Sequence, residues 1–254
     1  MSSPLQDRVA IVSGASRGIG EAIASAYVSA GASVTLTSRK LENVSAVAED
    51  INRQHPGRAL AMAAHAGDRE AVHSVVEQTV AEFGRLDIAV NNAATNPHFG
   101  PLLAAEEWQW DKILEVNLKG YFWLCQATAA RMKSQGEGGS LINIASVAGM
   151  EPGPMMGIYS VSKAGVLMLT KVLAVELAAD DIRVNAIAPG FVKTRFSQAL
   201  WDNPALNKGI VQRTPQARMG EPSEVAGLAV YLASEAASFT TGATFVVDGG
   251  YTLT

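Results

Sequence analysis

The stretch Val9-Ala-Ile-Val-Ser13-Gly14-Ala-Ser-Arg-Gly-Ile-Gly20 decides the fold, because an apolar run leads directly into three closely spaced glycines. The apolar run predicts a buried strand over 8–13, and the pattern beyond it predicts a helix over about 19–30. Glycine lets the turn approach a pyrophosphate closely, and the free N–H groups at the start of the helix attract an anion. The spacing differs from the usual Gly-x-Gly-x-x-Gly, and tight strand-to-helix turns also use glycine for structural reasons alone.

Short apolar runs alternate with longer helical patterns along the whole chain. Such alternation is typical of right-handed β-α-β units and a parallel sheet, whose strands are apolar throughout because both faces are buried. The 254 residues suit one such unit, and we see no linker to a second. We therefore predict one Rossmann-type α/β domain over 1–254, a doubly wound parallel sheet of seven strands with helices on both faces. The expected strands are 8–13, 33–37, 59–63, 86–90, 140–145, 183–187 and 244–247, and the expected helices are about 19–30, 41–54, 69–83, 106–134, 158–178 and 222–234.

The composition argues against several other classes of protein. The net charge is −4 and no run of lysine or arginine interrupts it, so we expect no nucleic-acid partner. The single cysteine, Cys125, cannot form an intramolecular disulfide, and the histidines show no metal-binding spacing, so we expect no metal. The short N-terminal apolar segment and the lack of a long uncharged apolar run lead us to expect a cytoplasmic protein that binds no membrane.

The helix expected over 158–178 is apolar on nearly all sides. A helix that covers a sheet needs only one apolar stripe, so the surplus requires a second buried surface. With no spare domain to provide it, a neighbouring subunit is the simplest candidate, and the alternative is that the chain's own loops cover it. We therefore expect an oligomer.

The end of the second strand indicates the cofactor. An NAD-binding unit places an acidic residue there to bind the ribose 2′-hydroxyl. Here the sequence is Thr37-Ser38-Arg39-Lys40, and Arg39 together with Arg17 would suit a 2′-phosphate. Glu42 is the rival, but it falls in the first turn of the next expected helix, where the dipole favours acids. Although Arg39 could also be a solvated surface charge, the pattern favours NADP(H).

Tyr159 and Lys163 are four residues apart at the start of an expected helix, so they share one of its faces. Ser146 follows an apolar strand, and open α/β sheets bind ligands at the carboxyl ends of their strands. An ammonium about 4 Å from a phenol would stabilise the phenolate by roughly 4 kcal/mol, which lowers the tyrosine pKa from its usual value near 10 by about 3 units. The three residues therefore predict proton exchange by Tyr159, with Ser146 bound to the substrate oxygen, during hydride transfer between a nicotinamide and a carbonyl carbon.

Together these motifs resemble the short-chain dehydrogenase/reductase family along essentially the whole chain. The glycine loop is similar to the family's Thr-Gly-x3-Gly-x-Gly, with Ser13 for threonine, and Asn91-Asn-Ala-Ala94 is similar to Asn-Asn-Ala-Gly, with Ala94 for glycine. This second departure puts the local backbone geometry in question rather than the chemistry. The resemblance implies a tetramer interface near Asp248-Gly-Gly250. It also implies a water held by the catalytic asparagine that links the lysine to solvent, and a catalytic set of Asn117, Ser146, Tyr159 and Lys163.

The resemblance assigns further residues to the cofactor. It implies an adenine contact from Asp68, a turn at Pro189-Gly190 beside the nicotinamide and a carboxamide contact from Thr194. The full set expected to contact NADP(H) is Gly14, Ser16, Arg17, Gly18, Ile19, Gly20, Ser38, Arg39, Asp68, Asn92, Ala93, Tyr159, Lys163, Pro189, Gly190, Val192 and Thr194.

Three patches, at 92–100, 188–197 and 200–201, are similar to the branch of NADPH-dependent carbonyl and retinal reductases. The loops after the fourth, fifth and sixth strands would form an apolar pocket that suits a bulky ketone, diketone or aldehyde. Each residue taken singly is more often plain packing. The expected substrate contacts, beneath a loop or lid at about 191–220, are Ser146, His98, Met150, Phe191, Phe196 and Trp201.

Two other functions remain open at this point. A 3-oxoacyl-carrier-protein reductase would perform the same chemistry, but it would need a basic patch for its acidic carrier, and we find no clear cluster of lysine or arginine. A regulator that senses NADP(H) without turnover would have no need of the complete set of Asn117, Ser146, Tyr159 and Lys163.

Overall fold

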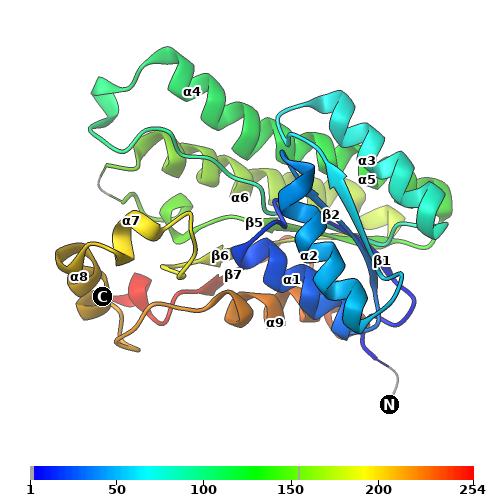
Figure 1. Cartoon of the computed structure of the whole chain (residues 1–254). Coiled ribbons are helices and arrows are strands. Elements are labelled where there is room, and N and C mark those ends of the chain that lie inside the picture. Colours follow the sequence, from blue (N-terminus) through cyan, green and yellow to red (C-terminus); the bar gives the residue numbers. More distant parts are fainter. Residues whose placement is uncertain (1–2, 154) are drawn as a thin grey trace.

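The computed structural model describes residues 3–153 and 155–254. Met1, Ser2 and Pro154, which the expected domain includes, lie outside the described residues. Within these ranges, seven parallel strands form one sheet in the order β3-β2-β1-β4-β5-β6-β7, with helices on both faces (Figure 1). The predicted doubly wound parallel sheet of seven strands is confirmed.

The elements follow one another in the alternating order that the sequence predicts. The strands are β1 (Val9–Ser13), β2 (Ser33–Ser38), β3 (Ala59–Ala63), β4 (Ile88–Asn91), β5 (Gly139–Ile144), β6 (Ile182–Pro189) and β7 (Thr244–Val247). The helices are α1 (Gly18–Ser29), α2 (Leu41–Gln54), α3 (Arg69–Phe83), α4 (Glu107–Leu114), α5 (Gly120–Gln135), α6 (Gly157–Leu177), α7 (Gln198–Trp201), α8 (Pro204–Arg213) and α9 (Pro222–Ala233).

The strand order reverses at β1, which pairs with β2 on one side and with β4 on the other. The chain builds outward from β1 to β3, then returns to the centre and builds outward again from β4 to β7. The loops after β1 and β4 therefore leave neighbouring strands at the same edge of the sheet. Open α/β sheets bind their ligands at this kind of position.

Two helical layers enclose the sheet. On one face α1, α2 and α9 bury apolar side chains against it, and on the other face α3, α5 and α6 do the same. Helix α1 also packs along α9, where the hydroxyl of Tyr27 donates to the Ala229 carbonyl at 3.1 Å. The five residues of β1 are all buried, which explains why this strand is apolar without alternation.

The helix predicted over 106–134 is present, but it is not uniform. A π-helical segment, η2 (Glu115–Lys119), joins α4 to α5 and contains Asn117. Segments of π-helix inside longer helices occur frequently at functional sites. The chain thus makes an irregular turn of helix at the asparagine that the family resemblance places in the catalytic set.

The segment expected to be a loop or lid at 191–220 contains two helices, α7 and α8. Helix α8 begins with an N-cap, because the side chain of Asn203 accepts hydrogen bonds from the N–H groups of Ala205 and Leu206, and Pro204 occupies the first turn. Helix α8 has no buried residue, so it lies on the surface.

Helix α6 leaves an apolar stripe uncovered. Its buried side packs against the sheet, whereas Val161, Met168, Val172 and Val175 are 44–80% exposed. The chain's own described loops therefore do not cover this stripe. Residues 157–180 are long and apolar enough to cross a membrane. The long core helix of a folded domain meets the same criteria of length and composition.

Candidate active site

The glycine loop needs its glycines. Gly14 and Gly18 have φ angles of +65° and +62°, a region that favours glycine. A Cβ atom on Gly14 would lie 2.8 Å from the Cα atom of Ala93, and one on Gly20 would lie 2.5 Å from Nδ2 of Asn92. The loop after β1 is thus packed tightly against the loop after β4.

Asn92 and Ser13 join these two loops with hydrogen bonds. The Asn92 side-chain amide donates to the carbonyls of Ser13 and Gly14, each at 3.0 Å. In return, the Ser13 hydroxyl accepts from the backbone N–H groups of Asn92 at 3.0 Å and Ala93 at 3.2 Å. Serine therefore supplies the hydroxyl at this position, and Ala94 is not among the described residues with a positive φ, so alanine fits there without backbone strain.

The residues expected at the adenosine end lie around the neighbouring loops. Arg17 and Arg39 are exposed, Ser38 ends β2, and its hydroxyl donates to the Lys40 carbonyl. Glu42 lies in the first turn of α2 and pairs with Lys40 at 3.6 Å. The Asp68 carboxylate caps α3 by accepting from Glu70 and Ala71, a structural role that the sequence analysis did not assign to it.

The segment after β6 reaches the glycine loop. A Cβ atom on Gly18 would lie 3.2 Å from Cγ2 of Thr194, so this threonine covers the start of α1. Val192 is buried and pairs with Gly220 in an isolated bridge. Pro189 ends β6, and the N–H of Gly190 donates to the Val247 carbonyl. The predicted Pro189, Gly190, Val192 and Thr194 therefore approach the same edge of the sheet as the glycine loop.

These features fit a dinucleotide. The glycine cradle has no room for side chains, Arg17 at the N-cap of α1 places no side-chain cap over the first turn, and Ser16 and Ile19 are partly buried beside it. Gly14, Gly18, Gly20, Asn92 and Ala93 would hold its phosphate-bearing part. When bound, a nicotinamide cofactor supplies or accepts the hydride.

Ser146, Tyr159 and Lys163 meet at the carboxyl end of β5. Ser146 caps the short 3₁₀ turn η3 (Val147–Gly149), and its hydroxyl accepts from the N–H of Ala148. Gly149 allows η3 to lie directly on α6, because a Cβ atom there would be 2.6 Å from the Lys163 carbonyl carbon. This contact brings Ser146 beside the phenol of Tyr159, which is buried in the first turn of α6.

The ammonium of Lys163 does not bind the phenol of Tyr159 in this structure. It donates instead to the Ile144 carbonyl at 2.7 Å and to the hydroxyl of Tyr121 at 3.1 Å, and it lies 5.7 Å from the centroid of the Tyr159 ring. Tyr121 was not found by sequence reasoning. The available signal was its spacing, since it follows Asn117 by four residues on the same helical run.

The pKa of Tyr159 is raised overall rather than lowered as the sequence analysis expected. Burial raises the pKa of Tyr159 to about 12, and the interaction with Ser146 lowers it by a smaller amount. Burial also lowers the pKa of Lys163 to about 7. The physical reason is that both groups are desolvated, while the nearest acceptors for the ammonium are Ile144 and Tyr121 rather than Tyr159. At neutral pH Tyr159 therefore keeps its proton and is suited to donate it.

Asn117 is buried, and both polar atoms of its side chain form hydrogen bonds. Its Oδ1 accepts from the N–H of Thr95 at 2.8 Å, and its Nδ2 donates to the Thr95 carbonyl at 3.0 Å and to the Ser162 hydroxyl at 3.2 Å. The amide thus ties the loop after β4 to α6. A water held by Asn117 stays a prediction.

The residues expected to contact substrate are not all in one place. Phe196 is 52% exposed and its ring lies 5.9 Å from that of Tyr159, centroid to centroid. Met150, next to η3, is also exposed. In contrast His98 is buried with Nε2 at 3.2 Å from the Pro101 carbonyl, and the Trp201 indole donates to the Thr194 carbonyl, so both side chains support loops.

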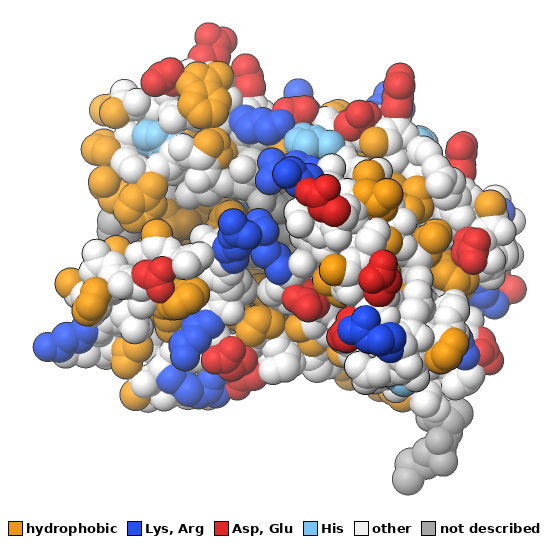
Figure 2. All heavy atoms as spheres, in the orientation of Figure 1, with side chains coloured by type: hydrophobic (Ala, Val, Ile, Leu, Met, Phe, Trp, Pro, Cys, Tyr) orange, Lys and Arg blue, Asp and Glu red, His pale blue; other side chains and the backbone are white. Residues whose placement is uncertain are grey.

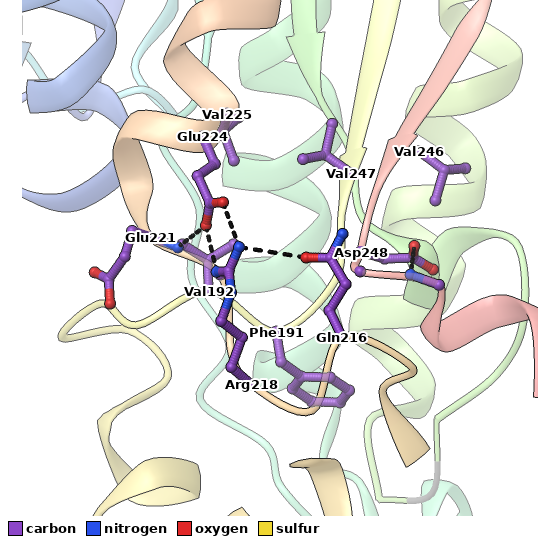
Figure 3. A pocket seen from close by; sticks show the side chains of 13 residues that line it. Phe191, Val192, Gln216, Arg218, Glu221, Glu224, Val225, Val246, Val247 and Asp248 are labelled. Carbon is purple, nitrogen blue, oxygen red and sulfur yellow. Dashed lines mark hydrogen bonds and ion pairs between the residues drawn. The ribbon is translucent and has the colours of Figure 1, made fainter. Parts of the chain in front are cut away.

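Phe191 is placed elsewhere, in a cavity of about 430 Å³ between the ends of β6 and β7 and the start of α9 (Figure 3). Its ring meets Tyr251 edge-on, with centroids 4.9 Å apart. The cavity's Arg218 is already paired with Glu224 at 2.6 Å. Because no member of the catalytic set lines this cavity, we do not assign it to the substrate. Figure 2 shows basic side chains beside a hollow near the middle of this face.

Comparison with known proteins agrees with this geometry. A family model described as Enoyl-(Acyl carrier protein) reductase matches residues 14–252. Over 248 residues the chain is 42% identical to "Dehydrogenase/reductase SDR family member 4" of Oryctolagus cuniculus, a match that covers 97% of this chain and 94% of that protein. Over 251 residues it is 39% identical to the A-factor type gamma-butyrolactone 1'-reductase (1S-forming) of Streptomyces virginiae, covering 98% and 97%.

A solved structure is similar over its whole length. The gluconate 5-dehydrogenase from Burkholderia cenocepacia J2315, in complex with NADP and tartrate, matches with a TM-score of 0.94 and 34% identity, covering 100% of this chain and 98% of that one. The chain belongs to the short-chain dehydrogenase/reductase family, whose members are oxidoreductases that use nicotinamide cofactors on small molecules.

Proposed function

We propose that this protein is an NADP(H)-dependent carbonyl reductase, which interconverts a hydrophobic ketone, diketone or aldehyde and the corresponding alcohol. The observation that carries the proposal is the buried phenol of Tyr159, which keeps its proton at neutral pH and lies beside Ser146 and the exposed ring of Phe196. A carbonyl oxygen placed there would accept a hydrogen bond from Ser146 and the proton from Tyr159. Phe196 and Met150 favour an apolar substrate.

Charge at the adenosine end supports NADP(H) over NAD(H). Arg17 and Arg39 follow neighbouring strands, β1 and β2, and both are exposed. The nearest candidate carboxylate, Glu42, is directed into an ion pair with Lys40. Guanidinium groups suit a 2′-phosphate, which NAD lacks. The solved relative that contains NADP is consistent with this choice.

Initial rates with a panel of ketones, diketones and aldehydes test the proposal, using NADPH and NADH in parallel. We expect turnover of apolar carbonyl compounds with a higher kcat/KM for NADPH. Turnover of an acyl-carrier-protein thioester alone would favour the carrier-protein reductase instead. Tyr159→Phe should abolish turnover and retain NADPH binding; full activity in that variant, or no turnover of any compound by the wild type in either direction, would overturn the proposal.

We also propose that the exposed stripe of α6 is covered by a second copy of the chain in a homotetramer. Val161, Met168, Val172 and Val175 recur on one side of the helix and would otherwise remain in water. Sedimentation at micromolar concentration tests this, and a monomer would contradict it. A cytoplasmic location remains a prediction.

A further inference from the structure

The catalytic lysine is almost completely buried and has an unusual partner. Lys163 is 1% exposed, and its ammonium donates to the Ile144 carbonyl at 2.7 Å and to the hydroxyl of Tyr121 at 3.1 Å. The ammonium also lies 4.8 Å from the centroid of the Tyr121 ring. Because a buried ammonium is stable only where its protons find acceptors, Tyr121 is part of what keeps this charge inside the protein.

The Tyr121 hydroxyl is oriented to act as an acceptor for Lys163. It donates its own proton to the Ile144 carbonyl at 3.0 Å, so the lone pairs of its oxygen are left for the ammonium. The backbone of Tyr121 is fixed as well, since its carbonyl accepts from the side chain of Asn91 at 3.1 Å. Tyr121, Ile144 and Lys163 thus form a closed triangle of hydrogen bonds between α5, β5 and α6.

The ionisable groups near the Lys163 ammonium come from α6 and from the elements that pack against it. Tyr159 lies on the same helix as Lys163, Cys125 on α5 acts on Tyr121, and β5 and η3 contribute no ionisable side chain. Burial alone accounts for the lowered pKa of Lys163. The remaining charged groups on elements that pack against α6 are Glu107, Asp111 and Lys112 on α4, Glu115 and Lys119 on η2, Arg131 and Lys133 on α5, Asp180 after α6, and Arg183 on β6.

We propose that Tyr121 is a positioning residue of the active site, whose hydroxyl holds the Lys163 ammonium against the Ile144 carbonyl and keeps it charged. The charge of Lys163, 5.7 Å from the centroid of the Tyr159 ring, then stabilises at a distance the phenolate that forms when Tyr159 gives its proton to the substrate. This inference rests on the proposed role of Tyr159 and Lys163. It adds that a third buried residue, outside the four predicted catalytic positions, controls the pH range in which that pair works.

Tyr121→Phe tests the proposal, with Tyr27→Phe as the matched control. Both substitutions remove one hydroxyl from a fully buried helical tyrosine that donates to a backbone carbonyl, but Tyr27 bonds to Ala229, far from Lys163 in the sequence and on the opposite face of the sheet. The readout is kcat for carbonyl reduction as a function of pH. Since Tyr159 keeps its proton well above neutrality, a loss of rate near pH 7 reports the deprotonation of Lys163.

Without its acceptor the ammonium is less stable, so the pKa of Lys163 should fall further. We expect the alkaline limb of the Tyr121→Phe profile to move to lower pH by about one unit. A hydrogen bond to a charged group typically stabilises it by enough to change its pKa by at least about one unit. The rate should be close to that of the wild type at the acid end and about tenfold lower above neutrality, and Tyr27→Phe should retain the wild-type profile. The same fractional loss at every pH, or a profile equal to that of Tyr27→Phe, would overturn the proposal.

A second variant covers the case in which Tyr121→Phe does not fold. 3,5-Difluorotyrosine at position 121 retains the hydroxyl and nearly the same shape but makes the oxygen a weaker acceptor. We expect a smaller shift in the same direction, and an unshifted limb would contradict the inference. Comparison of the wild type with Tyr159→Phe distinguishes a failure of the proposed function from a failure of the proposed role of Tyr121. Activity in Tyr159→Phe would refute the proposed function, whereas an inactive Tyr159→Phe together with an unshifted Tyr121 variant would refute only the role of Tyr121.

Discussion

Replacing Arg39 with aspartate is the sharpest test of cofactor choice. Arg39 is exposed after β2, where it would meet a 2′-phosphate. A hydrogen bond to a charged group contributes about 1.5–3 kcal/mol, and exposure places Arg39 toward the lower value. Its loss alone should therefore reduce kcat/KM for NADPH by roughly tenfold, at about 1.4 kcal/mol per factor of ten. Repulsion between the new carboxylate and the phosphate should increase this to about 30- to 100-fold.

The effect on NADH has the opposite sign. A carboxylate at position 39 can accept a hydrogen bond from the ribose 2′-hydroxyl, so kcat/KM for NADH should rise. The assay is the initial rate with each cofactor at a fixed concentration of the best ketone. Lys40→Asp is the control, because it makes the same change of charge one residue further on, where the lysine pairs with Glu42. Equal effects of the two variants, or a wild type that prefers NADH, would refute the reasoning.

Three further predictions concern the loop, the phenol and the sheet. Gly14→Ala should weaken binding of NADPH at least tenfold in a titration, because its Cβ would meet the backbone of Ala93 at 2.8 Å and its φ is positive; unchanged binding would show that the loop can move. Alcohol oxidation needs the Tyr159 phenolate and the Lys163 charge together, so its rate should rise with pH up to the pKa of Lys163 at about 7 and level off above it, whereas a rate that keeps rising beyond about pH 9 would show that the charge of Lys163 is not needed. Asp87→Asn should lower the free energy of unfolding by about 1–3 kcal/mol, because this 4% exposed carboxylate accepts from the N–H of Val9 and from Arg85; denaturant titration measures it, and a loss no larger than that of the exposed-pair control Asp50→Asn would contradict it.

The fold was predictable because each element carries its own local signal. The boundaries of β3 and β7 agree with the expected ranges, and the other strands differ by one or two residues at their ends. The start of β4 shows why. Leu86 is apolar and was expected in the strand, but its N–H and carbonyl both bond to the side chain of Gln135 on α5, so the strand begins only at Ile88. A contact between residues so far apart in the sequence leaves no local pattern.

Helix α8 could have been predicted from the sequence. Asn203-Pro204 is a typical helix start, with an N-cap residue followed by proline in the first turn, yet we interpreted the region as a loop or lid. Its absence of buried residues explains the difference, because a surface helix without an apolar stripe gives little periodic signal.

The chemistry of the site was only partly predictable. Spacing places Tyr159 and Lys163 on one face of α6, but it does not say which acceptor a buried ammonium will choose. That choice depends on Ile144 and Tyr121, which come from two other elements. The sequence likewise does not show that the ring of His98 bonds to the Pro101 carbonyl and supports the loop instead of contacting substrate.

The contact between α1 and α9 has a consequence for the order in which the chain can fold. Tyr27, in the second element to leave the ribosome, completes its burial only against α9, which is among the last elements made. Until then the N-terminal half presents the apolar surface of α1 that α9 later covers. During synthesis this half must therefore stay unfinished, exposed to chaperones and to wrong partners, until nearly the whole polypeptide has emerged.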